Sequence, residues 1–187
     1  LNAPMVRNRI GQKIGRLHVI TADDDGGRPF RSHAGQALLA VRGGADTIQN
    51  RTKRGDMGLM IADGLEVRQV CRRFGVTFLV NDRVDLCMAL DADGVHLGKE
   101  DMPVETARRL LGSRKIIGAT VRNAEDLLAA QRASADYVGC GPVFATSTKE
   151  LPVEPLGIEG LRRVAAAAGI PVIAIAGIAP DNVADVI

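Results

Sequence analysis

The chain has 187 residues, of which 46% are hydrophobic and 25% are charged. This composition is ordinary for a globular protein, and the length suits one domain with a sizeable core. The formal net charge of +2 gives no reason to expect nucleic acid or an anionic membrane as a partner. The aromatic content of 3% argues against a surface that stacks the bases of single strands.

No run is long and apolar enough to span a bilayer, because the apolar region 78–97 is broken by charged residues. The basic segment 1–16 lacks the apolar centre of a signal peptide, so secretion is not expected. Cys71, Cys87 and Cys140 are too few and too scattered for a disulfide framework or a zinc site. A cytoplasmic protein is therefore expected.

Short β-branched runs alternate with longer helical patterns from one end of the chain to the other. No linker or low-complexity tract interrupts them, so residues 1–187 are expected to form a single domain. In chain order, the pattern predicts a strand at 17–21, a helix at 34–41, a strand at 47–51, a helix at 57–74, a strand at 77–81, a helix at 84–90, a strand at 94–97, a helix at 104–111, a strand at 116–119, a helix at 124–134, a strand at 137–143, a helix at 158–168 and a strand at 172–175.

Strict alternation of strand and helix predicts an α/β fold, a (β/α)₈ TIM barrel with parallel strands. An open, doubly wound sheet is the alternative. The segment after the first predicted strand does not support an open sheet that binds a dinucleotide. No G-x-G-x-x-G follows that strand, and residues 23–27 are acidic. Only seven strands are predicted, so the eighth strand is expected to be absent and the barrel to be truncated after the seventh.

The second predicted strand ends in a cluster of cations. Side chains alternate along a strand, so Gln49, Arg51 and Lys53 share one face. Two cations and an amide on one face suit an anion, and arginine favours bidentate contact with phosphate. The alternative is a basic strand end that is simply solvated.

Two carboxylates follow neighbouring strands, Asp82 after the third and Asp101 after the fourth. One or two carboxylates together with substrate phosphates are the usual ligands of Mg²⁺ in proteins. Each aspartate could instead cap the helix that follows it. The cations after the second strand favour the metal, because a diphosphate would bind both.

The run 137–149 begins as an apolar strand and ends in a polar loop with Thr146, Thr148 and Lys149. Hydroxyls, backbone amides and an ammonium together suit a phosphate group. Gly177, after the seventh strand, would allow a phosphate close to its backbone N–H, or it would merely serve a turn.

Other polar residues suggest the kind of chemistry. Thr120, after the fifth strand, can donate one hydrogen bond. The three histidines show no spacing for a metal, and His96 is more consistent with a structural role. No Ser-His-Asp set or reactive cysteine is evident. A metal-assisted, electrostatic reaction on phosphorylated substrates is therefore favoured over covalent catalysis.

Taken in this order, the strand ends resemble the thiamine-phosphate synthase (thiamine-phosphate pyrophosphorylase) family, which is related to thiazole tautomerase. The likeness runs from residue 17 to residue 178. The motifs that carry it are Gln49-x-Arg-x-Lys53, Asn81-Asp-Arg-Val-Asp-Leu86, Asp91-Ala-Asp-Gly-Val-His-Leu-Gly98 and Gly141-Pro-Val-Phe-Ala-Thr-Ser-Thr-Lys149.

The resemblance implies a (β/α)₈ barrel that joins 4-amino-2-methyl-5-hydroxymethylpyrimidine diphosphate to a thiazole phosphate. Diphosphate leaves first, and the thiazole nitrogen then adds to a pyrimidine-stabilised carbocation. The catalytic groups implied are Arg51, Lys53, Thr120 and Lys149, with Mg²⁺ on Asp82 and Asp101. The pyrimidine diphosphate would contact Gln49, Asn50, Arg51, Thr52, Lys53, Asn81, Thr120 and Lys149. The thiazole phosphate would contact Thr146, Ser147, Thr148 and Gly177.

The chain departs from the family pattern at several positions. Asn50 and Thr52 stand where leucine and glutamate are usual, and Asn50 is expected to face the helix layer, where an unpaired amide is costly. Thr120 replaces serine and keeps the hydroxyl. Arg122 replaces a histidine, and Lys99 replaces a glutamine and adds a cation beside the proposed metal.

Three further expectations concern the end of the chain and its partners. Ala176 replaces the first of two glycines, and the missing eighth strand would normally complete the thiazole-phosphate site. The partners expected are small phosphorylated substrates, with no nucleic acid, no membrane and a homo-oligomer left open. Thiazole tautomerase and a non-catalytic phosphate-binding barrel are the alternative functions.

Overall fold

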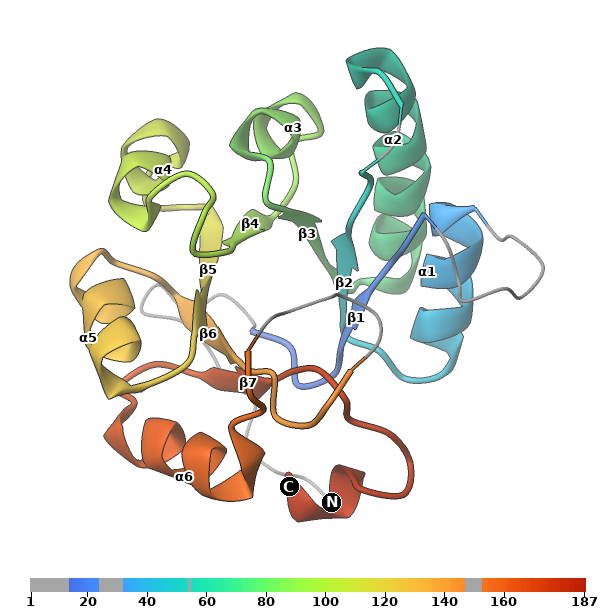
Figure 1. Cartoon of the computed structure of the whole chain (residues 1–187). Helices are drawn as coiled ribbons and strands as arrows, with labels where there is room; N and C mark the ends of the chain where they lie inside the picture. Colours follow the sequence, from blue (N-terminus) through green and yellow to red (C-terminus); the bar gives the residue numbers. More distant parts are fainter. Residues whose placement is uncertain (1–13, 24–31, 54, 147–152) are drawn as a thin grey trace.

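Seven parallel strands alternate with six α-helices in the computed structural model, which describes residues 14–23, 32–53, 55–146 and 153–187 (Figure 1). In chain order the elements are β1 (His18–Ile20), α1 (His33–Arg42), β2 (Thr47–Asn50), α2 (Met57–Phe74), β3 (Thr77–Asn81), α3 (Val84–Ala89), β4 (Gly94–Leu97), α4 (Val104–Leu111), β5 (Ile116–Val121), α5 (Ala124–Arg132), β6 (Tyr137–Cys140), α6 (Gly157–Ala167), β7 (Val172–Ala174) and the 3₁₀ turn η1 (Val183–Asp185).

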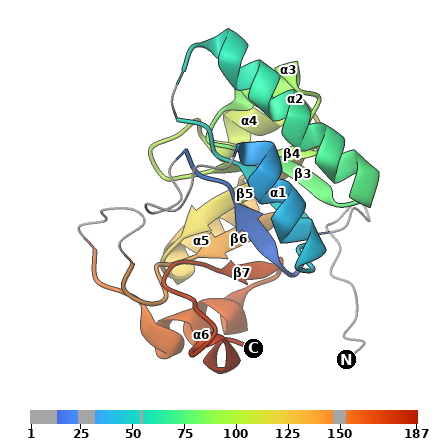
Figure 2. The ribbon, with the colours of Figure 1, turned by 90° about the vertical axis from the view of Figure 1, so that its right-hand side faces the viewer.

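The strands lie side by side in sequence order, and every neighbouring pair is parallel. The sheet curves around a central axis with the helices outside it, as Figure 1 shows along the axis and Figure 2 from the side. The predicted TIM-barrel fold is thereby confirmed, with seven of its strands in the described residues. A doubly wound sheet would reverse its strand order, and this sheet does not.

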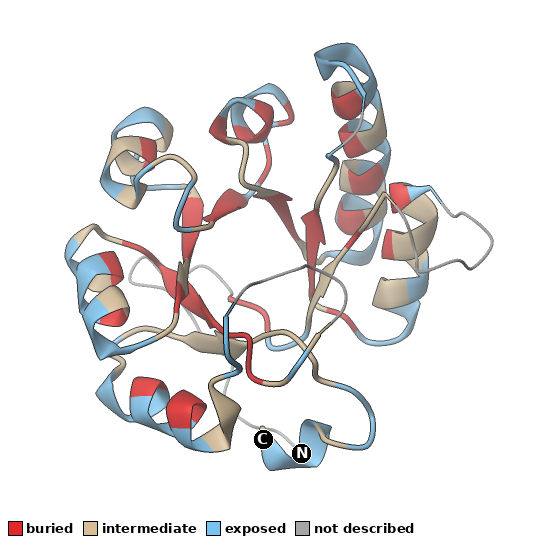
Figure 3. Cartoon of the chain, in the orientation of Figure 1, coloured by how far each residue is buried: buried red, intermediate tan, exposed pale blue. Residues whose placement is uncertain are grey.

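The main core fills the space between the sheet and the helices. Ile48, Val80 and Val95 point outward from β2, β3 and β4 and are almost fully buried. A second cluster around Leu127 and Val138 packs α5 and α6 on β5–β7. Figure 3 shows the buried faces of the helices turned toward the strands. This packing explains why the strands are short apolar runs, since both faces are covered.

Several boundaries of strands and helices differ by a few residues between the prediction and the structure. β6 ends at Cys140 and not at residue 143, because Pro142 has no backbone N–H to donate to a strand ladder. β5 continues to Val121, two residues past the prediction. Asn123 caps α5 and accepts a hydrogen bond from the Asp126 N–H at 2.8 Å. Side-chain caps of this kind also begin α1, at Ser32, and α2, at Asp56.

A buried ion pair fastens the amino-terminal side of the barrel. Arg108 of α4 donates to Asp136 Oδ2 at 2.5 Å and to the carbonyl oxygens of Lys115 and Ser134 at 2.7 and 3.0 Å. The same Asp136 oxygen accepts from the backbone N–H of Ile117 at 2.9 Å. The Asp136 side chain has no exposed surface. This pair therefore joins α4, β5 and the loop before β6.

The three cysteines are free and buried. Burial raises the pKa of Cys71 and of Cys87 to about 12 and that of Cys140 to about 11. Thiols with such pKa values stay protonated at neutral pH, so they are poor nucleophiles. Across the described ranges, no helix is both long enough and apolar enough to cross a membrane.

Ala176, after β7, adopts a left-handed backbone with φ of 74°. A side chain at such a φ costs roughly 1 kcal/mol, and glycine avoids most of that cost. We expect Ala176→Gly to raise the free energy of unfolding by about 1 kcal/mol in urea titrations. Ala174→Gly, within β7, is the matched control and should lower it. A lower stability for Ala176→Gly would contradict the assignment of strain.

Candidate functional site

The strands of the curved sheet line a cavity. It is lined by residues of β1, β2, β4, β6 and β7, including Gln49, His96, Tyr137 and Ile173. Gln49 is 3% exposed, and its Oε1 has no hydrogen-bond partner within the described residues. A buried acceptor left unpaired is costly unless a ligand supplies the donor. A ligand with an N–H or O–H group in this cavity could supply that donor.

A chain of hydrogen bonds crosses the cavity wall from Tyr137 to Thr120. The Tyr137 hydroxyl lies 2.9 Å from His96 Nδ1, and His96 Nε2 lies 3.0 Å from Thr120 Oγ1. Burial lowers the pKa of His96 to about 4 and raises the pKa of Tyr137, so the imidazole is neutral and the phenol protonated at pH 7.

The neutral imidazole donates from one ring nitrogen and accepts at the other, so in either tautomer it joins the Tyr137 hydroxyl to the Thr120 hydroxyl. The structural role predicted for His96 thus includes orienting a site residue.

The depressed pKa of His96 makes folding sensitive to acid. The unfolded chain binds a proton at this histidine near pH 6.5, whereas the folded chain binds it only near pH 4. Stability is therefore complete above pH 6.5 and is lost as the pH falls to 4, by about 3 kcal/mol. Urea unfolding of the wild type and of His96→Gln from pH 7 to pH 4 measures this difference. Equal pH dependence in both proteins would refute it.

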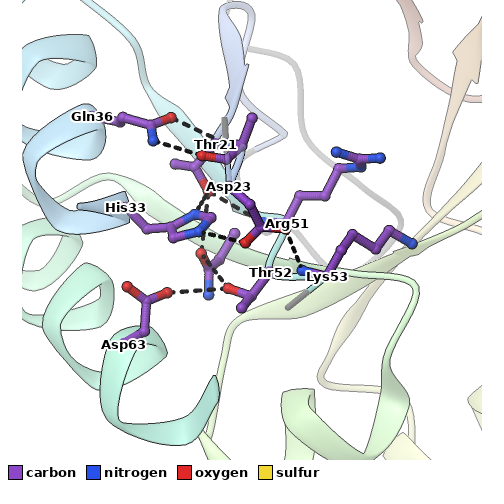
Figure 4. A network of polar contacts seen from close by, with 10 residues as sticks. Thr21, Asp23, His33, Gln36, Arg51, Thr52, Lys53 and Asp63 are labelled. Carbon is purple, nitrogen blue, oxygen red and sulfur yellow. Dashed lines mark hydrogen bonds and ion pairs between the residues drawn. The ribbon is translucent and has the colours of Figure 1, made fainter. Parts of the chain in front are cut away.

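The residues after β2 divide between two faces, as the alternation predicts. The Arg51 and Lys53 side chains extend away from α1, whereas Thr52 turns toward Asp63 of α2 (Figure 4). The Thr52 hydroxyl donates to Asp63 Oδ2 at 3.1 Å. The geometry thus gathers the two predicted cations on one side of the strand end.

Asn50 faces the helix layer as expected, and its amide is paired. It is 3% exposed, and its Oδ1 accepts from the Thr21 hydroxyl at 3.1 Å and lies 3.5 Å from the Thr52 hydroxyl. The expected cost of an unpaired amide is therefore avoided, because β1 brings Thr21 alongside the end of β2. These contacts explain how Asn50 is accommodated where the family pattern has leucine.

Asp82 and Asp101 lie together, and neither caps the helix after it. Residue 83 is the N-cap of α3, residue 103 is the N-cap of α4, and neither helix has a side-chain capping bond. Asp101 Oδ2 accepts from the Gly98 N–H at 2.7 Å. Burial, and then a hydrogen bond and the charge of Asp82, raise the pKa of Asp101. The capping alternative is therefore wrong for both residues.

Lys53 joins the carboxylates to the basic strand end. Its Nζ forms an ion pair with Asp82 Oδ2. The described residues hold no cluster of three or more histidine, cysteine or acidic side chains that could bind a metal. The predicted binding of Mg²⁺ by Asp82 and Asp101, together with substrate phosphates and water, stays a prediction. Asn81 ends β3 beside this group, in register with His96.

Two cations placed near the site by sequence have protein partners. Lys99 forms an ion pair of 2.7 Å with Asp126 of α5 and does not add a free cation beside the carboxylates. Arg122 donates to the carbonyl oxygen of Glu154 at 2.6 Å. Arg122 thus ties the end of β5 to the segment that precedes α6.

Of the predicted phosphate loop, 146–149, only Thr146 lies within the described residues. Thr146 is half-buried and lies in a small hollow with Phe144 and Pro155. Ser147, Thr148 and Lys149 lie outside the described residues. Their predicted contacts with the two substrates stay predictions.

Gly177 is required by its own surroundings. Its φ is 69°, and a Cβ there would lie 2.5 Å from the carbonyl oxygen of Ala145 and 2.7 Å from the backbone carbon of Phe144. The glycine therefore allows the chain after β7 to pack against the chain after β6, a reason that the sequence did not reveal. Its predicted contact with a phosphate stays a prediction.

The carboxyl ends of β2–β5 thus bring together Gln49, Lys53, Asp82, Asp101 and Thr120, with the Arg51 side chain extending from the same strand end. A parallel β/α barrel with cations, paired carboxylates and a buried unpaired acceptor at this end defines an enzyme that acts on phosphorylated substrates. The chain belongs to the thiamine monophosphate synthase family, whose model matches residues 17–187.

Similar proteins agree with this assignment. The chain is 47% identical to "Thiamine-phosphate synthase" of Chloroflexus aurantiacus over 171 residues, which cover 91% of the chain and 78% of that protein. It is 48% identical to "Thiamine-phosphate synthase" of Methanoregula boonei, with the same coverage.

Two solved structures have the same fold, and one of them also carries a related name. The structure titled "Thiamine phosphate pyrophosphorylase from Pyrococcus furiosus" superposes with a TM-score of 0.80 at 41% identity, covering 91% of this chain and 79% of that one. An N-acetylmannosamine-6-phosphate 2-epimerase from Clostridium perfringens superposes with a TM-score of 0.63 at 16% identity, which is a likeness of fold alone.

Proposed function

We propose that this chain is a Mg²⁺-dependent thiamine-phosphate synthase. It joins 4-amino-2-methyl-5-hydroxymethylpyrimidine diphosphate to a thiazole phosphate and releases diphosphate and thiamine phosphate. The observation that carries the proposal is the grouping of Lys53 with Asp82 and Asp101 beside the cavity that Gln49 lines. A diphosphate and its metal need such a mixed set of cations and carboxylates.

The cavity residues suit the pyrimidine. Gln49 Oε1 is an unpaired buried acceptor, and the pyrimidine carries an amino group that can donate to it. The Thr120 hydroxyl, held by its hydrogen bond with His96 Nε2, can form a further hydrogen bond with the ring. These two groups would orient the ring so that its exocyclic methylene faces the second substrate.

The chemistry we propose needs no protein nucleophile. The bond between the methylene carbon and the diphosphate oxygen breaks first, and both electrons leave with the diphosphate. Arg51, Lys53 and Lys149 stabilise the charge that develops there. Mg²⁺ on Asp82 and Asp101 supplies further electrostatic stabilisation of the same oxygens when bound. The thiazole nitrogen then donates its lone pair to the methylene carbon.

The thiazole phosphate would bind at Thr146, Ser147, Thr148 and Gly177, opposite the diphosphate. We expect the enzyme to work in the cytoplasm on these small substrates. Thiazole tautomerase is the alternative activity, and it would need no diphosphate site. The close grouping of Lys53 with Asp82 and Asp101 favours the synthase.

A product assay separates the two activities. Purified protein with Mg²⁺, the pyrimidine diphosphate and the thiazole phosphate should yield thiamine phosphate by chromatography. The same protein given a thiazole phosphate isomer alone should leave it unchanged. Isomerisation without coupling would overturn the proposal in favour of the tautomerase.

A further inference from the structure

Arg51 and Lys53 lie beyond the end of β2, where no strand ladder holds their backbone. β2 ends at Asn50. The Arg51 N–H donates to Thr21 Oγ1 at 3.2 Å, and the Lys53 N–H donates to Asp23 Oδ2 at 2.8 Å. The backbone of each cation is therefore held by a side chain from the segment that follows β1.

His33, the first residue of α1, joins these two side chains. Its Nδ1 lies 2.6 Å from Thr21 Oγ1, and its Nε2 lies 3.1 Å from Asp23 Oδ1 (Figure 4). A carboxylate only accepts hydrogen bonds, so Nε2 carries a proton. The His33 and Asp23 side chains are 6% and 15% exposed, so water competes little for these contacts. We call Thr21, Asp23 and His33 the polar clamp.

The first turn of α1 holds the polar clamp in place. Ser32 caps the helix and accepts from the Gly35 N–H at 3.1 Å. Gln36, one turn along, donates to the Ala22 carbonyl oxygen at 2.7 Å and accepts from the Ala22 N–H at 3.0 Å. These bonds fix residues 21–23 to α1. The polar clamp in turn fixes the end of β2 to the same helix.

The polar clamp lies on the side of β2 opposite to the cationic side chains. Figure 4 shows Arg51 and Lys53 extending away from His33. Lys53 reaches Asp82 from there. Asp23 compensates any charge on His33, so the polar clamp is not itself an anion site. Its contacts with Arg51 and Lys53 are made to their backbone N–H groups, and Thr21 also contacts Asn50 Oδ1 and the Gln49 carbonyl oxygen.

We propose that Thr21, Asp23 and His33 are positioning residues that set the backbone of Arg51 and Lys53 so that both cations meet one diphosphate. The proposal deepens the proposed function and rests on it. A cation whose backbone is not held would lose conformational entropy when it binds the diphosphate, whereas a backbone fixed in advance avoids that cost. Removing either backbone contact should therefore weaken diphosphate binding without removing a charge that touches it.

Calorimetric titration with inorganic diphosphate in Mg²⁺ tests this directly. We expect Thr21→Val and Asp23→Ala to bind it on the order of 10- to 100-fold more weakly than the wild type. Thr21→Ser keeps the hydroxyl and should restore binding. Asp63→Ala is the matched control, because it removes a hydrogen bond to Thr52 in the same region but neither backbone contact.

The expected pattern is specific to one substrate. Binding of the thiazole phosphate should be unchanged in every variant, whereas a general loosening of the fold would weaken both ligands. If Thr21→Val fails to fold, Asp23→Ala carries the test, because the Asp23 side chain is 15% exposed whereas Thr21 is fully buried. Diphosphate affinities that match the wild type, or that fall no further than in Asp63→Ala, would overturn the positioning role. The measurement needs no turnover, so it is independent of whether the wild type makes thiamine phosphate.

Discussion

Asp136→Ala should destabilise the barrel by about 3–5 kcal/mol, the usual cost of leaving one partner of a buried ion pair alone. The Arg108 side chain, which is only 13% exposed, would lose the carboxylate that it contacts at 2.5 Å. The Ile117 N–H would lose its acceptor. Urea unfolding followed by circular dichroism measures the loss. Because ordinary domains are stable by only about 5–15 kcal/mol, the variant would approach its unfolding threshold.

An exposed ion pair provides the control for that result. Arg162 and Glu159 form a pair on α6 with side chains 66% and 71% exposed. Glu159→Ala should change the free energy of unfolding by less than about 1 kcal/mol. Equal losses in the two variants would show that burial of the Arg108–Asp136 pair has no energetic consequence.

Asp82→Asn should reduce kcat/KM for the pyrimidine diphosphate on the order of 100-fold, with little change in melting temperature. Asparagine tolerates the φ of 65° at this position and keeps the shape of the side chain. It loses the charge that pairs with Lys53 and that a metal would require. Steady-state rates over a range of Mg²⁺ concentrations would show the defect.

Asp85→Asn is the matched control for Asp82→Asn. Asp85 pairs with Arg83 at 2.5 Å and its side chain is 53% exposed. Its replacement should leave turnover unchanged. If Asp82→Asn keeps full activity and loses only melting temperature, Asp82 serves the fold and not the metal.

The order of strands and helices could be predicted because each signal is local. Apolar runs of β-branched residues mark strands covered on both faces, and caps such as Asn123 mark helix starts. α2 and β3 were predicted to the residue, Met57–Phe74 and Thr77–Asn81. The boundary of β6 was missed because Pro142 ends the ladder inside an apolar run.

The candidate site could be predicted in outline, since parallel strands carry their carboxyl ends to one side of the barrel. Lys53 and Asp82 were expected near each other because both follow strand ends that a single diphosphate could join, and the structure pairs them. The partners of Asn50, Lys99 and Arg122 could not be predicted, because each comes from another element. The role of His33 was missed for the same reason, since it acts through Thr21 and Asp23, which lie 12 and 10 residues away.

The most direct test of the proposed function is a mass balance on the purified protein. With both substrates and Mg²⁺ present, we predict one diphosphate released for each thiamine phosphate formed. Both products should disappear when Mg²⁺ is chelated or when either substrate is omitted. Diphosphate released without thiamine phosphate, or neither product from a folded protein, would contradict the account.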